Sequence, residues 1–129
     1  MVQRVRDHPA TLADPADLPA LFEDVDAVVL VDGALGVAPG VVRSWTVEEA
    51  LRRLVPHSGM SHMLGLGDAL RLCQLLDRLP GYIRIVTIGI EVTLLGQPVS
   101  PRVLRSVDRA ARTAERLLRC GVHPGSTLV

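Results

Sequence analysis

Two side chains of metal-binding type stand at informative places in the sequence, Asp32 and His62. Asp32 ends an apolar run that begins at Val28, and His62 stands in a glycine-containing segment that opens an amphipathic helix. A buried strand that ends in Asp delivers its carboxylate to the rim of a sheet, where α/β proteins bind their ligands. A carboxylate and an imidazole at one rim can hold a divalent metal ion between an oxygen and a nitrogen. The pair therefore predicts a metal site, and an incomplete one.

Each member of this pair also has a purely structural interpretation. Asp before Gly at a strand end is common turn chemistry, and a His in a glycine-rich segment can cap a helix or face solvent. Glu91 follows the other strong strand and is the best placed candidate for a third ligand. Ser61 adjoins His62, but the G-x-S-x-G motif of serine hydrolases is absent from the sequence. No spacing argument places Asp7, His8 or Asp14 at the rim. His57, between a proline and a serine, is expected to be solvated in a loop, and His123 belongs to the tail.

The composition predicts one well-packed cytoplasmic domain over residues 1–129. With 48% apolar and only 2% aromatic residues, the core is expected to consist of Val, Leu, Ile and Ala. The 14 basic residues, all of them arginine, balance 14 acidic ones, so no global field attracts nucleic acid or a membrane surface. The charged first residues do not resemble a signal peptide, and no apolar run approaches the roughly 20 residues that span a bilayer.

Apolar spacing and turn residues predict the elements that must position these groups. A continuously hydrophobic run at Ala27–Asp32 and a run rich in β-branched residues at Tyr82–Ile90 predict buried strands, and a looser pattern at Val41–Val47 indicates an edge strand. The expected helices are a short one capped by Asp14 or Asp17, one at Glu48–Leu54, one from the glycine-rich segment 58–67 to Leu79, and one from Arg102 to the residue before Gly121. Residues 121–129 are expected to form a loose tail. This order predicts an α/β fold, a three-layer sandwich with a short mixed sheet.

Two further patterns concern thiol chemistry and surface charge. Cys73 falls among the apolar positions of a helix, which predicts a buried, inert thiol, and Cys73 and Cys120 do not make a disulfide scaffold. Arginines recur every three or four residues along the last helix, at Arg102, Arg105, Arg109, Arg112, Arg116 and Arg119. This stripe is interpreted either as a solvated outer face or as a docking surface for an acidic partner.

The pieces, in this order, resemble the nickel-iron hydrogenase maturation endopeptidases over about residues 12–120. The motifs that carry the resemblance are Val28–Asp32 followed by Gly36 and Pro39-Gly40, Ser61-His62-Met63-Leu64-Gly65-Leu66, Leu79-Pro80, Ile88-Gly89-Ile90-Glu91 and Val99-Ser100-Pro101. That family removes a C-terminal peptide from the hydrogenase large subunit after nickel insertion. The resemblance implies that the large-subunit precursor is the partner, that it supplies the nickel, and that Asp32 and His62 contact this metal.

The chain departs from the family pattern before Asp14. Family members have a first strand, a Gly-Asn pair and an Asp-Asp-Gly or Asp-Glu-Gly element with a third metal-contacting carboxylate, and this sequence has no such segment there. The fold is therefore expected to lack the family's first strand, which leaves unpaired backbone edges in the sheet. A truncated, a mis-started and a degenerate relative all fit the sequence.

Two functions remain, an endopeptidase of this family with no assigned catalytic residue, or a catalytically incomplete relative that binds the large subunit without cleaving it. An unrelated metabolic enzyme would need a phosphate-binding glycine loop after a strong strand, and the sequence has none.

Overall fold

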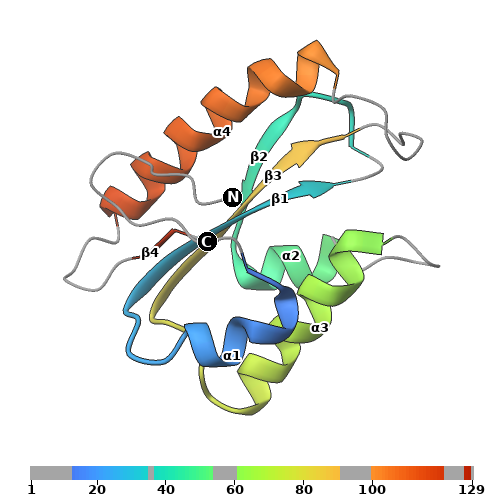
Figure 1. The fold of residues 1–129 in the computed structure, drawn as a ribbon. Helices are drawn as coiled ribbons and strands as arrows, with labels where there is room; N and C mark the ends of the chain where they lie inside the picture. Colours follow the sequence, from blue (N-terminus) through green and yellow to red (C-terminus); the bar gives the residue numbers. More distant parts are fainter. Residues whose placement is uncertain (1–12, 35–36, 54–60, 91–99, 121–126, 129) are drawn as a thin grey trace.

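A mixed β-sheet with helices on both faces organises the protein (Figure 1). The computed structural model describes residues 13–34, 37–53, 61–90, 100–120 and 127–128, and at residues 53, 61–65 and 127–128 it describes the backbone only. The strands are β1 (Ala27–Ala34), β2 (Val42–Trp45), β3 (Tyr82–Gly89) and β4 (Thr127–Leu128). The helices are η1 (Pro15–Asp17), α1 (Leu18–Leu21), α2 (Val47–Arg53), α3 (Ser61–Leu75) and α4 (Pro101–Cys120).

The strand order in the sheet is β2-β3-β1-β4. Strand β1 runs parallel to β3 and β4, whereas β2 runs antiparallel to β3. Helix α4 covers one face of the sheet, and α1, α2 and α3 cover the other (Figure 1). The predicted three-layer α/β sandwich with a mixed sheet is confirmed. The predicted edge position of the strand near Val41–Val47 is also confirmed, because β2 lies at one end of the described sheet.

The central strands β1 and β3 bury both of their faces, which explains why their sequences are mostly apolar. Alternate residues contact the layer of α1, α2 and α3, and these are Val28, Leu30, Ile83 and Ile85. The residues between them contact α4, and these are Ala27, Val29, Val86 and Ile88. Each Val, Leu or Ile side chain among them contributes about 1.5–3 kcal/mol when it leaves water, so these two clusters hold the three layers together.

Helix α4 begins as its sequence predicts. The Ser100 hydroxyl oxygen accepts a hydrogen bond from the Val103 N–H (3.3 Å), and Pro101 at the first helical position has no N–H that needs a partner. The buried face of the helix repeats every three or four residues and consists of Val103, Ser106, Ala110, Ala114 and Leu118. Its six arginines are all exposed, so the helix is polar on the outside and apolar on the inside.

Helix α3 ends at Leu75 and does not continue to Leu79 as predicted. Asp77 adopts a left-handed conformation with φ of 54°, and the N–H of Arg78 donates to the carbonyl of Cys73 (2.8 Å). This closure uses a left-handed residue to turn the chain away from the helix axis. The sequence indicates a stop at Pro80-Gly81, but the backbone turns earlier because an Asp tolerates the left-handed region.

The carboxyl-terminal segment is not a loose tail throughout. Thr127 and Leu128 form β4, which lies parallel to β1 opposite Val28 and Val29, and residues 121–126 and 129 lie outside the described part of the chain. Thr127 and Leu128 supply hydrogen-bond partners to the edge of β1, whose N–H and C=O groups would otherwise be unpaired there. Past Val29, no strand of the described residues lies beside that edge.

Cys73 lies in the core between α3 and the sheet with no exposed surface, as predicted. Burial raises the pKa of its thiol, and the charge of Arg78 opposes this effect only in part. The thiol therefore stays protonated near neutral pH, which suits a structural cysteine. Cys120 is exposed, and neither cysteine is in a disulfide. Within the described part of the chain, no helix is long and apolar enough to cross a membrane.

Candidate functional site

Asp32 lies near the end of β1, on the sheet face that α3 covers. It shares strand parity with Val28 and Leu30, which contact that layer of helices. The sequence predicts that the strand ends at Asp32. In the structure β1 continues to Ala34, so Asp32 lies inside the strand. Its Oδ1 accepts a hydrogen bond from the N–H of Gly33 (2.8 Å), and the residue is half-buried. The carboxylate is thus held in a fixed direction at the carboxyl end of a parallel pair of strands.

His62 belongs to the first turn of α3. The helix packs through Leu66 and Leu70 on the same cluster as Val28 and Leu30. Figure 1 shows that α3 begins at the end of the sheet where the arrowheads of β1 and β3 lie. The backbone therefore brings residues 32 and 62 to one face and one end of the sheet. The side chain of His62 lies outside the described residues, and its contact with a metal stays a prediction.

A glycine-containing turn closes this end of the sheet. Gly89, the last residue of β3, lies so close to the turn that a Cβ built on it would stand 2.0 Å from the carbonyl oxygen of Ala38. The N–H of Gly89 donates to the carbonyl of Val41, and its own carbonyl accepts from Gly40 (both 2.9 Å). Gly40 has φ of 81°, a value that residues with a side chain rarely adopt. The glycines thus let the turn lie directly on the strand ends beside the candidate site.

Trp45 and Thr87 form a polar contact beside Asp32 that the sequence does not predict. The indole N–H of Trp45 donates to the Thr87 hydroxyl (2.9 Å), and Thr87 is completely buried. Thr87 stands opposite Asp32 in the register of β1 and β3. The available signal was a hydroxyl residue inside an otherwise apolar strand, because a buried hydroxyl needs a partner.

Replacing Thr87 by Val removes the acceptor of the Trp45 N–H at nearly constant volume. We expect Thr87→Val to lower the free energy of unfolding by about 1–2 kcal/mol, because a partly buried donor loses its partner. Urea unfolding followed by circular dichroism measures this change. As a control, Thr87→Val should cost much less in a Trp45→Phe background, where no indole N–H remains. Equal losses in both backgrounds would assign the cost to packing and contradict the role of the hydrogen bond.

Most other candidate ligands fall outside the described residues. These are Asp7, His8, His57, Glu91 and His123. Asp14 is described and is exposed, and its Oδ1 caps η1 by accepting from the N–H of Ala16 (3.0 Å). The predicted cap is confirmed for Asp14, whereas Asp17 makes no side-chain cap. Among the described residues, no three His, Cys, Asp or Glu side chains are grouped to hold a metal ion.

Comparison with known proteins agrees with this arrangement. The HycI family of hydrogenase maturation proteases matches residues 13–117. Among solved structures, the chain is 27% identical to the [NiFe] hydrogenase maturation protease HybD from Thermococcus kodakarensis, with a TM-score of 0.61 over 79% of this chain and 74% of that one. The fold is also similar to that of the hydrogenase maturating endopeptidase HybD from Escherichia coli, with 20% identity and a TM-score of 0.65 over 81% of this chain and 67% of that one.

A third similar structure is an endopeptidase from Escherichia coli, with 18% identity and a TM-score of 0.65 over 95% of this chain and 78% of that one. No match was found among curated proteins. The family match extends from the segment before η1 to the last turns of α4 and so includes Asp32, His62 and the strands around them. We conclude that this protein belongs to the hydrogenase maturation protease family.

Proposed function

We propose that this protein is the endopeptidase that removes the C-terminal peptide from a nickel-iron hydrogenase large-subunit precursor after nickel insertion, in the cytoplasm. The family match over residues 13–117 carries this proposal. The placement of Asp32 and the start of α3 at one end of the sheet supports it, because both residues of the predicted metal contact belong to that end.

In this proposal Asp32 and His62 recognise nickel that the precursor already holds. A carboxylate oxygen and a neutral imidazole nitrogen both suit a borderline ion such as Ni²⁺. The hydrogen bond from Gly33 orients Oδ1 of Asp32, as outer contacts of metal ligands commonly do. Two protein ligands leave the other coordination positions of the nickel to the thiolates of the substrate. The protein is therefore expected to bind the nickel-loaded precursor in preference to the nickel-free one.

The direct test mixes the purified protein with nickel-loaded precursor. We expect a C-terminal peptide to be released and a shortened large subunit to appear, both measured by mass spectrometry. Nickel-free precursor, treated in the same way, should stay intact, because the predicted recognition depends on the metal. Cleavage of both precursors at one rate would contradict the role of nickel.

The alternative function has a different outcome in the same experiment. A relative that binds without cleaving would capture the loaded precursor in a pull-down and release no peptide. That result would overturn the proposed endopeptidase activity. Stoichiometric peptide release would exclude the alternative.

A further inference from the structure

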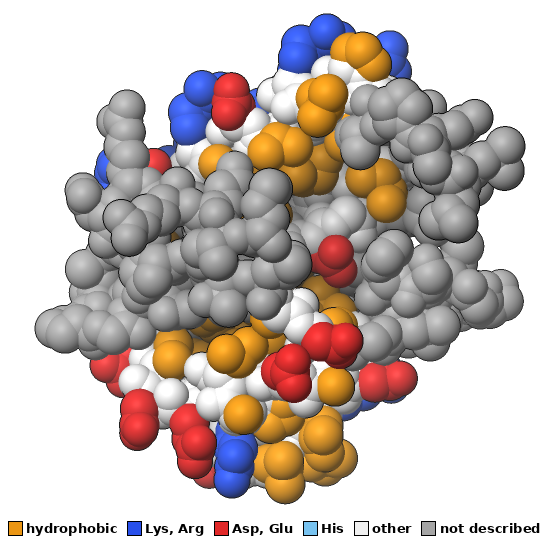
Figure 2. All heavy atoms as spheres, in the orientation of Figure 1, with side chains coloured by type: hydrophobic (Ala, Val, Ile, Leu, Met, Phe, Trp, Pro, Cys, Tyr) orange, Lys and Arg blue, Asp and Glu red, His pale blue; other side chains and the backbone are white. Residues whose placement is uncertain are grey.

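The neutral chain separates its charges between two sides. Figure 2 shows arginine side chains gathered over α4 and acidic side chains gathered over the layer of α1 and α3. Helix α4 carries six arginines against two acidic residues, Asp108 and Glu115. Arg119 and Glu115 form the one ion pair found within the described part of the chain. The α4 side of the protein is therefore strongly basic although the whole chain has no net charge.

Strand β2 offers an open backbone edge at one lateral end of the sheet. In the described chain it has a strand on one side only, which is β3. The N–H of Gly89 donates to the carbonyl of Val41, and bonded and non-bonded residues alternate along an antiparallel pair. Val42 and Ser44 therefore direct their N–H and C=O groups away from β3. These are the groups to which an added strand would bond.

A cavity of about 580 Å³ adjoins this edge, lined by Arg43, Ser44, Trp45, Glu49 and Arg52. Glu49 is hydrogen-bonded to Thr46 at the start of α2. Its carboxylate accepts from the Thr46 hydroxyl (3.1 Å), and its N–H donates to the Thr46 hydroxyl oxygen (3.2 Å). Arg43 and Arg52 are exposed and form no ion pair among the described residues. The cavity thus combines an aromatic wall with two guanidinium groups that form no ion pair among the described residues.

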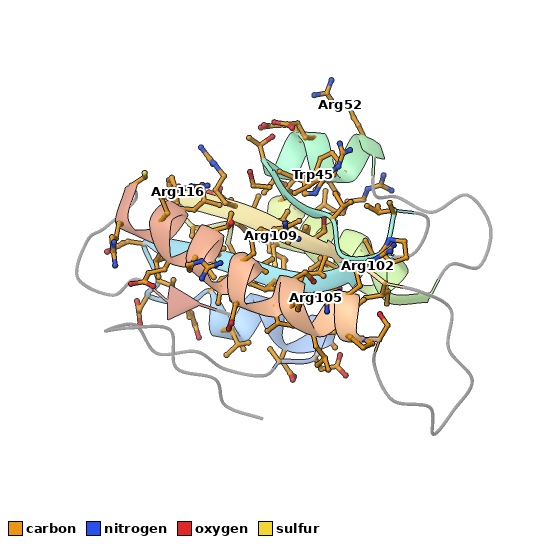
Figure 3. The ribbon with its side chains drawn as sticks, turned by 90° about the horizontal axis from the view of Figure 1, so that it is seen from above. Trp45, Arg52, Arg102, Arg105, Arg109 and Arg116 are labelled. Carbon is orange, nitrogen blue, oxygen red and sulfur yellow. The ribbon has the colours of Figure 1, made fainter. Side chains whose placement is uncertain are left out.

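The arginines of α4 flank the same edge from the opposite face of the sheet. Helix α4 contacts β2, and Arg116, Arg109 and Arg105 follow one another along it (Figure 3). Trp45 packs with the cluster of α1, α2 and α3 on the other face, and Arg52 belongs to α2. Arg109 ties the helix to the start of the edge, because its Nη2 donates to the carbonyl of Gly40 (2.6 Å). The backbone edge of β2 therefore lies between the basic helix on one face of the sheet and the arginine-lined cavity on the other.

The geometry points to this surface as the docking site for an extended acidic segment of the substrate protein, which adds to β2 as a further strand. This inference rests on the proposed function, which supplies a protein substrate. An acidic segment satisfies the backbone groups of Val42 and Ser44 and pairs its carboxylates with Arg43 and Arg52. A second copy of this chain fits worse, because pairing β2 with β2 brings like-charged arginines together.

A labelled heptapeptide of alternating glutamate and valine serves as the probe, with binding to the whole protein followed by fluorescence anisotropy. We expect binding that weakens as salt is added, and no comparable binding of a lysine and valine peptide. The Arg43→Glu/Arg52→Glu variant should weaken binding about tenfold, because each change replaces attraction with repulsion. The matched control is Arg71→Glu/Arg78→Glu, which makes the same charge change at exposed positions in and just after α3. Equal losses in both variants would overturn the docking site.

Ser44→Pro tests the added strand separately from the charge. Proline removes an N–H that points away from β3, so the existing strand pair loses no hydrogen bond. We expect peptide binding to be lost while circular dichroism and the melting temperature stay close to those of the wild-type protein. Unchanged binding by Ser44→Pro would overturn strand addition. A wild-type dimer that Ser44→Pro converts to a monomer in sedimentation would assign the edge to a second copy and overturn the acidic segment.

Cleavage of nickel-loaded precursor separates this inference from the proposed function. If the docking site and the proposed function both hold, Arg43→Glu/Arg52→Glu raises the KM of cleavage about tenfold and changes kcat much less, since docking contributes to substrate binding. If wild-type protein binds the acidic peptide and cleaves no precursor, the proposed function fails. If it cleaves the precursor and both double variants share the wild-type KM, the docking site fails and the proposed function stands.

Discussion

Asp32→Asn and His62→Ala each lower the rate of C-terminal peptide release by about 100-fold or more. This size is expected because even outer contacts of a metal site cost roughly 10–100-fold when they are lost. Asn at position 32 still accepts the hydrogen bond from Gly33 and removes the negative charge that favours a cation. The fold is therefore expected to survive the change. The measurement is single-turnover cleavage of nickel-loaded precursor, with peptide release quantified by mass spectrometry.

Asp17→Asn is the matched control for this prediction. It makes the same chemical change on an exposed residue that forms no side-chain cap. Its cleavage rate should equal that of the wild-type protein. Circular dichroism spectra of all variants should overlay, which separates a lost metal contact from lost folding. Wild-type rates in both Asp32→Asn and His62→Ala would remove these residues from the site.

Gly89→Ala is expected to have the largest effect on stability. The new Cβ would stand 2.0 Å from the carbonyl oxygen of Ala38 and 2.8 Å from its carbonyl carbon. Both neighbours are backbone atoms, so no side chain can rotate away, and the turn must leave the end of β3. Overpacking, together with weakened hydrogen bonds of Gly89 to Val41 and Gly40, should cost about 3 kcal/mol or more. The melting temperature should fall by about 10 °C.

Gly81→Ala provides a control at the residue just before the other end of β3. A Cβ at Gly81 meets nothing nearer than the carbonyl oxygen of Asp26, at 4.0 Å. Its stability should change by less than about 1 kcal/mol, since replacing Gly without strain mainly restricts the unfolded chain. Urea unfolding followed by the fluorescence of Trp45, the one tryptophan in the sequence, compares the two variants. Equal midpoints for Gly89→Ala and Gly81→Ala would show that the turn is not packed against β3.

Local patterns account for the elements that the sequence predicts correctly. Val28 to Val31 are apolar without interruption, and Ile83 to Ile88 are mostly β-branched, which is typical of strands buried on both faces. Ser100 and Pro101 mark a helix start through side-chain and backbone chemistry that acts within one turn. These signals depend on neighbours in the chain, so they are readable without the fold. The end of α3 was less readable, because Asp77 enters the left-handed region without a glycine to announce it.

By itself the sequence determined the strand cores, the layered α/β class, the helix start at Ser100 and the two side chains expected to contact a metal. Only the tertiary structure decided that α3 covers the face that carries Asp32, that Trp45 reaches Thr87 across 42 residues, and that Gly89 lies under the carbonyl of Ala38. The difference has a physical cause. Periodicity and capping act between residues a few positions apart, whereas the pairing of strands and the choice of helix face depend on how distant segments exclude water together.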